Sequence, residues 1–171
     1  KLRPVFAEGG SVTAGNSSQT SDGAAFVMVV SERMLKELEV EPIARLKSYH
    51  VSGLEPRIMG MGPVPATQRL LGRLGVELAE IGVIEINEAF AAQSIAVLRT
   101  LSIPEEKVNV NGGAIALGHP IGASGTRILV TLIHEMIKRD VHKGVATLFQ
   151  LHLKMHLSPC QHKSVYQKKI K

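Results

Sequence analysis

The pattern of hydrophobic and polar positions predicts short strands that alternate with amphipathic helices along most of the chain. The clearest helix runs over Ser124–Lys138, where apolar residues recur at helical spacing and Ser124 is expected to act as the cap. Its apolar stripe is expected to contain Ile128, Leu129, Leu132, Ile133, Met136 and Ile137, and its water-facing side Thr131, Glu135 and Lys138. This alternation favours an α/β fold in which helices pack on a sheet.

The remaining segments are assigned in the same way. Helices are expected at Glu32–Leu38 behind a capping Ser31, at 66 to about 74, and at 88–101. Strands are expected at 43–51, 82–86 and 144–148, and the apolar run 24–30 fits a buried strand or the start of a helix. Residues 10–23 and the Gly/Pro-rich stretch 60–65 are expected to form loops.

Composition places the chain among globular proteins. It has 171 residues, of which 44% are hydrophobic and 20% charged, with no Trp, so the core must be aliphatic. The formal net charge is +5, and no acidic residue follows Asp140, so the stretch 149–171 is expected to be a basic and poorly ordered tail. No apolar run approaches the roughly 18 residues of a membrane span, and no known motif or aromatic platform indicates nucleic-acid binding.

Two features concern the origin of the chain. The single cysteine, Cys160, excludes an internal disulfide framework, which is consistent with a reducing compartment. The chain starts without Met and shows no signal-peptide pattern, so it reads like the middle of a longer protein from the cytoplasm or an organelle matrix.

The chemistry concentrates in the stretch NGGAIALGHPIGASGTR at 111–127. It places His119 in a loop with several glycines, and Pro120 follows directly. Loops held by a rigid scaffold often carry catalytic groups. A lone GHP triplet would indicate only an exposed turn, but here three further motifs precede it: VTAGNSSQTSDGAA at 12–25, IMGMGPVPA at 58–66 and NEAF at 87–90.

In this order and at these separations, the four motifs resemble the C-terminal half of a thiolase, most closely a degradative 3-ketoacyl-CoA thiolase. The resemblance covers about residues 10–148. It implies a layered α/β fold, of which this chain supplies the C-terminal half: a mixed sheet with helices on both faces. Residues 1–38 would then end the N-terminal half and 39–148 would form the C-terminal domain.

The resemblance also implies an activity. Thiolases cleave a 3-ketoacyl-CoA with coenzyme A, as in fatty acid β-oxidation, or run the reverse condensation. Coenzyme A is a substrate, no further cofactor is required, and family members are homo-oligomers. Direction and chain-length preference are not readable from these residues.

By resemblance, His119 is the base for a nucleophilic cysteine and a donor to an oxyanion, and Asn87 holds the water that completes this oxyanion hole. From the residues alone, Asn87 could equally be the cap of a helix at 88–101, and Glu88 a structural pairing or capping residue. Substrate or coenzyme A contacts are implied for Ser18, Met59, Phe90 and Gly118. Taken singly, these would be ordinary turn or core residues.

The sequence departs from the family pattern in two places. The family's nucleophilic cysteine belongs to the N-terminal half, and Phe149 stands where the second, acid–base cysteine is expected, with Leu151 in place of a glycine. The abrupt change after Leu148 suggests a shifted reading frame. The alternative is therefore a catalytically inactive thiolase-like fragment.

Two further readings remain open. One is a ketoacyl-synthase type of condensing enzyme, against which NEAF and GHP together count. The other is a basic or zinc-binding module based on His152, His156 and Cys160, although Pro159 interrupts their helical spacing. No metal site is expected.

Overall fold

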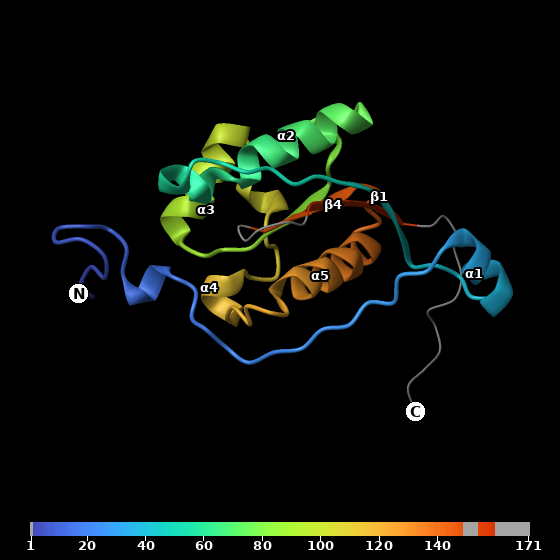
Figure 1. Ribbon diagram of the computed structural model, residues 1–171, viewed down its shortest axis with the longest axis horizontal. Coiled ribbons are helices and arrows are strands. Elements are labelled where there is room, and N and C mark those ends of the chain that lie inside the picture. Colours follow the sequence, from blue (N-terminus) through green and yellow to red (C-terminus); the bar gives the residue numbers. More distant parts are fainter. Residues whose placement is uncertain (1, 149–153, 160–171) are drawn as a thin grey trace.

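The computed structural model describes residues 2–148 and 154–159, and its centre is a mixed sheet of four strands (Figure 1). The strands are β1 (Ala44–Tyr49), β2 (Val83–Ile86), β3 (Gly144–Thr147) and β4 (Lys154–Pro159), in the order β1-β4-β3-β2. Strands β2 and β3 are parallel, and β4 runs antiparallel to both of its neighbours. The expected α/β fold with a mixed sheet is confirmed.

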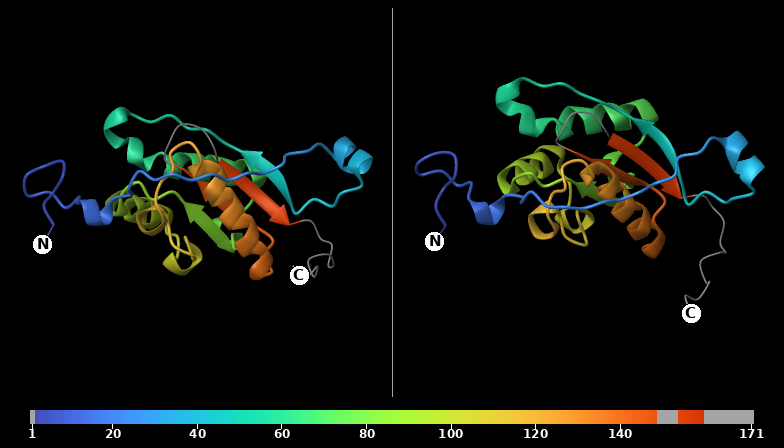
Figure 2. Two further views of the ribbon diagram at one scale, coloured as in Figure 1. Left: turned by 90° about the horizontal axis from the view of Figure 1, so that it is seen from below. Right: turned by 60° about the horizontal axis from the view of Figure 1, so that its bottom comes forward.

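Helices cover both faces of this sheet (Figures 1 and 2). Helices α2 (Pro63–Leu74) and α3 (Ala91–Leu101) lie on one face, and α5 (Ser124–Lys138) lies on the other with the short α4 (Ala114–Leu117). Helix α1 (Glu32–Leu38) lies apart from them. Short 3-10 helices form at Ala14–Asn16, Pro56–Met61, Leu78–Glu80 and Glu105–Lys107. Among the residues described, no helix combines the length and the apolarity that crossing a membrane requires.

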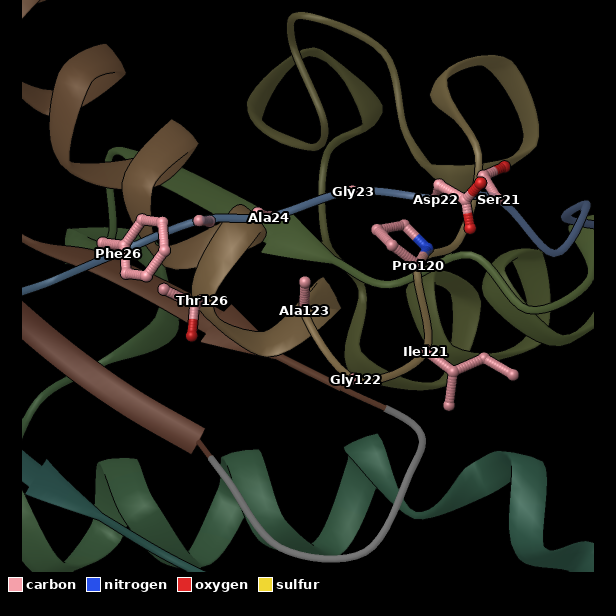
Figure 3. Close-up of a pocket in the computed structure, with 11 residues that line it drawn as sticks. Ser21, Asp22, Gly23, Ala24, Phe26, Pro120, Ile121, Gly122, Ala123 and Thr126 are labelled. Atoms are coloured by element: carbon pink, nitrogen blue, oxygen red, sulfur yellow. The ribbon is translucent and has the colours of Figure 1, made fainter.

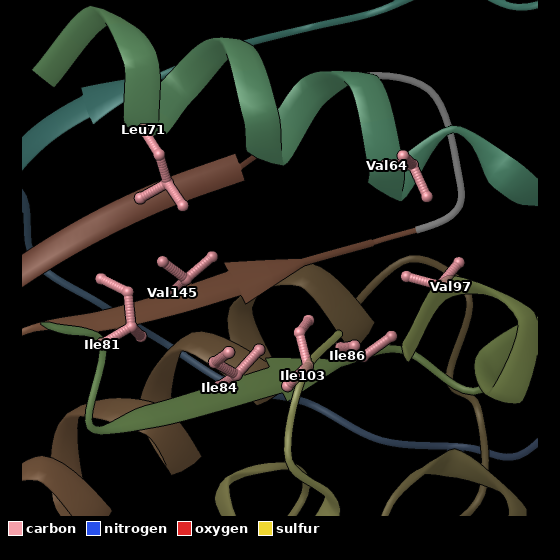
Figure 4. Close-up of a cluster of buried hydrophobic side chains, with 8 residues drawn as sticks. All are labelled: Val64, Leu71, Ile81, Ile84, Ile86, Val97, Ile103 and Val145. Atoms are coloured by element: carbon pink, nitrogen blue, oxygen red, sulfur yellow. The ribbon is translucent and has the colours of Figure 1, made fainter. Parts of the chain in front are cut away.

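The core has two parts because β2 and β3 are buried on both faces. The part under α2 and α3 is shown in Figure 4 and consists of Val64, Leu71, Ile81, Ile84, Ile86, Val97, Ile103 and Val145. The part under α5 consists of Val83, Ile128, Leu129, Leu132, Met136 and Ala146. Successive residues of a strand point to opposite faces. Strands β2 and β3 therefore hold the helices of both layers in place.

Several element ends agree with local sequence signals. Ser31 caps α1 as expected, because its Oγ accepts a hydrogen bond from the backbone N–H of Met34 at 3.2 Å. Strands β1, β2 and β3 lie within the ranges expected for them. Helix α2, in contrast, begins at Pro63 instead of 66, and residues 56–61 form a 3-10 helix directly before it. A proline fits the first helical turn because the N–H it lacks would have no partner there.

Two other helix starts differ from the predictions. Helix α3 begins at Ala91 instead of 88. Ser124 is the first residue of α5, and the cap residue is Ala123. The Ser124 hydroxyl contacts the ring of His119 instead of capping the helix. Glu88 binds Asn109 and Ile115, which lie more than twenty positions later in the chain, whereas the Ser124 hydroxyl binds residues of the loop directly before its helix.

On α5, burial differs from the expected amphipathic pattern at two positions. Glu135 is buried, with 3% of its surface exposed, because Asn111 Nδ2 donates to its carboxylate at 2.8 Å and Arg139 Nε also donates to it. Ile137 is 50% exposed, although the pattern places it in the apolar stripe. A carboxylate can be buried when it is satisfied by such donors.

The apolar run 24–30 is neither a strand nor a helix. It follows an extended path along the side of the molecule that carries α4 and α5, and Phe26 is 90% exposed (Figures 1 and 2). Its hydrophobic composition favours burial, but no described residue pairs with its backbone as a strand.

The tail differs from the expectation over 154–159. There the chain forms β4, which pairs with β1 and β3. Backbone hydrogen bonds between strands do not depend on side-chain identity, so composition alone did not indicate this strand. The positions of Phe149, Leu151, His152 and Cys160, to which the sequence assigned meaning, lie outside the described residues.

Candidate active site

One short segment, residues 17–21, connects the motif loops that the sequence singled out. At its start, Ser17 forms an antiparallel bridge with Phe90 of the NEAF motif. The backbone N–H of Ser18 donates to the carbonyl oxygen of Ala89 at 3.0 Å, and the Ser18 hydroxyl donates to the same oxygen at 3.2 Å. The NEAF loop is thus held against this connecting segment through its backbone.

The end of the connecting segment holds the histidine loop. Thr20 forms a parallel bridge with His119, and the His119 N–H donates to the carbonyl oxygen of Gln19 at 2.9 Å. Gly118 has φ +94°, and a Cβ at this position would lie 2.2 Å from Ser21 Oγ. Glycine is therefore required for both its conformation and its close approach. The two loops meet on one strip of backbone.

The His119 ring is fixed by a buried serine. Its Nδ1 lies 2.6 Å from the hydroxyl oxygen of Ser124, the first residue of α5. Ser124 is fully buried, and its hydroxyl lies 3.1 Å from the carbonyl oxygen of Pro120. No hydrogen bond joins Nε2 of His119 to another of the residues the structure describes. This nitrogen therefore remains available to a ligand.

Electrostatics favour the neutral form of His119. Partial burial is the main cause that lowers the pKa of His119, and the positive charge of Arg127 lowers it further. The Nε, Nη1 and Nη2 atoms of Arg127 are buried, and none has a hydrogen-bond partner in the described structure. A neutral imidazole near pH 7 can accept a proton, as a general base must.

Asn87 lies at the end of β2, and its backbone N–H donates to the carbonyl oxygen of Thr147 at 2.9 Å. It is fully buried, yet neither Oδ1 nor Nδ2 has a hydrogen-bond partner within the described structure. Because α3 begins only at Ala91 with Phe90 as its cap residue, the interpretation of Asn87 as a helix cap is wrong. A buried amide without partners is costly and is typical of a binding site.

Glu88 has the structural role that the sequence suggested. One of its carboxylate oxygens accepts a hydrogen bond from Asn109 Nδ2 at 2.8 Å, and the other from the N–H of Ile115 at 3.2 Å. Ile115 lies in the first turn of α4, where backbone N–H groups lack helical partners. Glu88 therefore ties the NEAF loop to the glycine-rich stretch that leads to His119.

An open pocket lies next to the histidine loop (Figure 3). Its volume is about 390 Å³, and its walls are residues 21–26 on one side and residues 120–123 with Thr126 on the other. Gly23 packs against the ring of Pro120, because a Cβ there would lie 2.9 Å from Pro120 Cγ. Residues 21–26, which continue from the connecting segment, therefore shield only part of the histidine loop from solvent.

Comparison with known protein families identifies the family of the chain. The family described as "Thiolase, C-terminal domain" matches residues 40–151, which is more than half of the chain. The chain belongs to the thiolase family. A second match, to "Thiolase, N-terminal domain", covers residues 1–33. The resemblance to the thiolase family inferred from the four motifs is thereby confirmed.

Thiolases from bacteria are among its similar relatives. The chain is 58% identical over 148 residues to an acetyl-CoA acetyltransferase of Pseudomonas aeruginosa, an alignment that covers 86% of this chain and 38% of the relative. It is 54% identical over 147 residues to a 3-ketoacyl-CoA thiolase of Bacillus subtilis, with 86% and 38% covered. The chain therefore spans well under half the length of these relatives.

Solved thiolase structures share the fold. The acetyl-CoA acetyltransferase of Bacillus anthracis superposes with a TM-score of 0.89 at 44% identity, covering 93% of this chain and 41% of that one. Human mitochondrial 3-ketoacyl-CoA thiolase in complex with CoA superposes with a TM-score of 0.86 at 42% identity, covering 94% and 41%.

The four residues predicted to contact substrate or coenzyme A in this thiolase chain lie in different surroundings. Ser18 contacts Ala89, which follows Asn87 closely in the chain, and Gly118 directly precedes His119. Phe90 is half-buried, and its ring packs edge-on against Phe6 with 5.6 Å between ring centroids. Met59 is 58% exposed on the 3-10 helix Pro56–Met61, and no hydrogen bond or bridge links it to the other site residues described.

Three residues of this region were not predicted as site residues from the sequence: Ser124, Arg127 and Glu85. Glu85 lies in the middle of β2 and is fully buried. Burial is the main reason that the pKa of Glu85 is raised to about 7. The positive charge of Arg127 lowers this pKa, and the negative charges of nearby carboxylates raise it. An acidic residue inside an apolar strand was the signal that could have revealed it, since carboxylates are rarely fully buried.

Proposed function

We propose that this thiolase chain supplies the general base and the oxyanion-binding asparagine of a coenzyme A-dependent acyl transferase. The observation that carries the proposal is the placement of His119 and Asn87 on two loops that the connecting segment 17–21 joins. His119 offers an unpaired Nε2 and a lowered pKa, and Asn87 offers a buried amide without partners. A base and a fixed donor are the two groups that acyl transfer through a thiolate requires.

The proposed reaction follows from these groups. His119 Nε2 accepts the proton of a cysteine thiol, and the resulting thiolate forms a bond to the 3-keto carbon of a 3-ketoacyl-CoA. The bond between the α and β carbons then breaks, and a second cysteine thiol protonates the acetyl-CoA enolate. Free coenzyme A then passes its thiol proton to that second cysteine and takes the acyl group from the first. The reverse sequence is a condensation. No cysteine is present among residues 2–148 and 154–159, so the thiol must come from elsewhere.

Coenzyme A is the proposed ligand. The superposition on human mitochondrial 3-ketoacyl-CoA thiolase in complex with CoA supports it, and the net charge of +5 suits a polyphosphorylated molecule. Ser18, Met59, Phe90 and Gly118 are proposed to contact the ligand. Coenzyme A acts as a substrate, and no further cofactor is proposed. Homo-oligomerisation belongs to the same proposal and is measurable by light scattering.

A chimera tests the proposal directly. Residues 40–148 of this chain replace the corresponding segment of the Pseudomonas aeruginosa acetyl-CoA acetyltransferase, which supplies the remainder of the enzyme. Thiolysis of acetoacetyl-CoA by the chimera is the expected result. His119→Gln is expected to lower its kcat by about 10²–10⁴-fold and Asn87→Ala by about 10²–10³-fold. The exposed Glu106→Gln serves as a control that leaves turnover unchanged.

The 171-residue chain is assayed in parallel for thiolysis and, by calorimetry, for coenzyme A binding. We expect it to show no turnover alone, because its described part lacks a thiol. A folded chimera without activity would overturn the proposal. An active chimera beside an inactive chain would identify the chain as a thiolase portion that keeps the base but cannot complete the reaction.

A further inference from the structure

We infer that Ser124 is a positioning residue that holds His119 in the tautomer with its proton on Nδ1, so that the Nε2 lone pair faces the thiol. The inference rests on the proposed role of His119 as a base. It concerns which of the two ring nitrogens carries the proton, a question that the identity of the residue alone leaves open.

Counting protons at the Ser124 hydroxyl leads to this tautomer. The hydroxyl has one proton and lies within hydrogen-bond distance of two groups, His119 Nδ1 at 2.6 Å and the Pro120 carbonyl oxygen at 3.1 Å. A carbonyl oxygen can only accept. Both contacts are therefore hydrogen bonds at the same time only if the hydroxyl donates to Pro120 and accepts from an Nδ1–H group. In the other tautomer, the contact with Pro120 is lost.

The surroundings keep these atoms in place. Ser124 is fully buried in the first turn of α5, and its backbone N–H also donates to the Pro120 carbonyl oxygen at 2.8 Å. On the other side, the His119 backbone donates to Gln19 and Gly118 packs directly against Ser21. The ring and the hydroxyl are thus each attached to a different fixed element, and their contact does not depend on a mobile side chain.

This arrangement suits proton transfer. When a thiol S–H bond breaks and its proton moves to Nε2, a thiolate and an imidazolium result. The imidazolium keeps its Nδ1–H donor to Ser124, and the Ser124 proton stays on its bond to Pro120. No hydrogen in this chain of contacts has to move, which is the meaning of a preorganised base. In the other tautomer Nε2 already carries the ring proton and cannot accept the proton of the thiol.

The test is an NMR measurement of the His119 ring nitrogens in the 171-residue chain labelled with nitrogen-15 histidine. His119→Gln identifies the signals by their loss. At pH values high enough for the ring to be neutral, we expect Nδ1 to show the chemical shift and couplings of a protonated nitrogen. Nε2 should show those of an unprotonated nitrogen. The reverse assignment in the wild-type chain would overturn the inference, whatever the serine variants show.

Three serine variants separate positioning from mere packing. Ser124→Ala is expected to reduce the ratio of the Nδ1–H to the Nε2–H tautomer by about tenfold, the effect of one neutral hydrogen bond. Ser124→Thr, which keeps a hydroxyl, is expected to retain the wild-type ratio. Ser94→Ala removes another buried helical hydroxyl, one without a partner among the described residues, and should leave His119 unchanged. An unchanged ratio in Ser124→Ala would refute the role of the serine.

The measurement needs neither coenzyme A nor turnover. An inactive chimera together with the expected tautomer would refute the proposed function alone. An active chimera together with the reverse tautomer would refute only the role of Ser124.

Discussion

Replacing Glu85 with glutamine is expected to stabilise the chain at alkaline pH and to have a much smaller effect at acidic pH. Glu85 is fully buried in β2, and neither of its carboxylate oxygens has a hydrogen-bond partner in the described structure. Glutamine has nearly the same shape and stays neutral. The substitution therefore removes the titration of this group while it keeps most of the packing.

The magnitude follows from the pKa. Burial raises the pKa of Glu85 from its ordinary value of 4.5 to about 7. Because the folded state holds the proton more tightly, the contribution of Glu85 to stability is fully present below pH 4.5 and is lost as the pH rises through about 7. Between about pH 5 and about pH 8, this loss amounts to roughly 2–3 kcal/mol.

The assay is urea unfolding followed by circular dichroism at several pH values. The quantity of interest is the difference in unfolding free energy between Glu85→Gln and wild type, because other titrating groups cancel in it. This difference should shift in favour of the variant by about 2–3 kcal/mol from about pH 5 to about pH 8, a midpoint change on the order of 1–2 M urea. The exposed Glu106→Gln should show a constant difference across the same range. A pH-independent difference for Glu85→Gln would refute the reasoning.

Three further outcomes can be measured on the same chain. Gly118→Ala should lower the unfolding free energy by at least about 1–3 kcal/mol because of its positive φ and the clash with the connecting segment. Gly122→Ala, which has open space for a Cβ, should change it much less, and equal effects would contradict the argument. Arg127→Gln should raise the pKa of His119 in an NMR titration because it removes a positive charge, whereas Arg127→Lys keeps the charge and should not. An unchanged pKa in the glutamine variant would count against the electrostatic role of Arg127. Leu132→Ala, at a fully buried position, should cost about 2–5 kcal/mol in urea unfolding, and a cost below about 1 kcal/mol would contradict its place in the core.

Where the signals are local, the sequence predicted the structure well. Helix α1 has the expected bounds and the expected Ser31 cap, and α5 ends at Lys138 as expected. The NEAF and GHP motifs indicate the family through residue identity and order alone, and the family match confirmed it. Helix periodicity and capping involve residues within a few positions of one another, so a single sequence contains the information that determines them.

Predictions failed where partners are distant in sequence. The hydrophobic pattern places the carboxylate of Glu135 in water, but Asn111, 24 positions away, holds it in the interior. The run 24–30 has a composition that favours burial, but a hydrophobic pattern does not specify the partner that would cover it. Ser124 is a different case, because its partner His119 is only five positions away, but a capping rule considers the backbone of the helix and not the side chain of a neighbouring loop.

The sequence by itself therefore determined strands β1, β2 and β3, the places of the main helices, the family and the two principal candidate residues. Only the tertiary structure decided how the candidates meet. It joined Ser18 to Ala89 across 71 positions and docked the His119 loop on the same segment. It also left the Asn87 amide buried and without partners within the described part of the chain, and placed Arg127 close enough to lower the pKa of His119. The physical reason is that burial and charge depend on what packs around a group, and that is fixed only once distant segments come together.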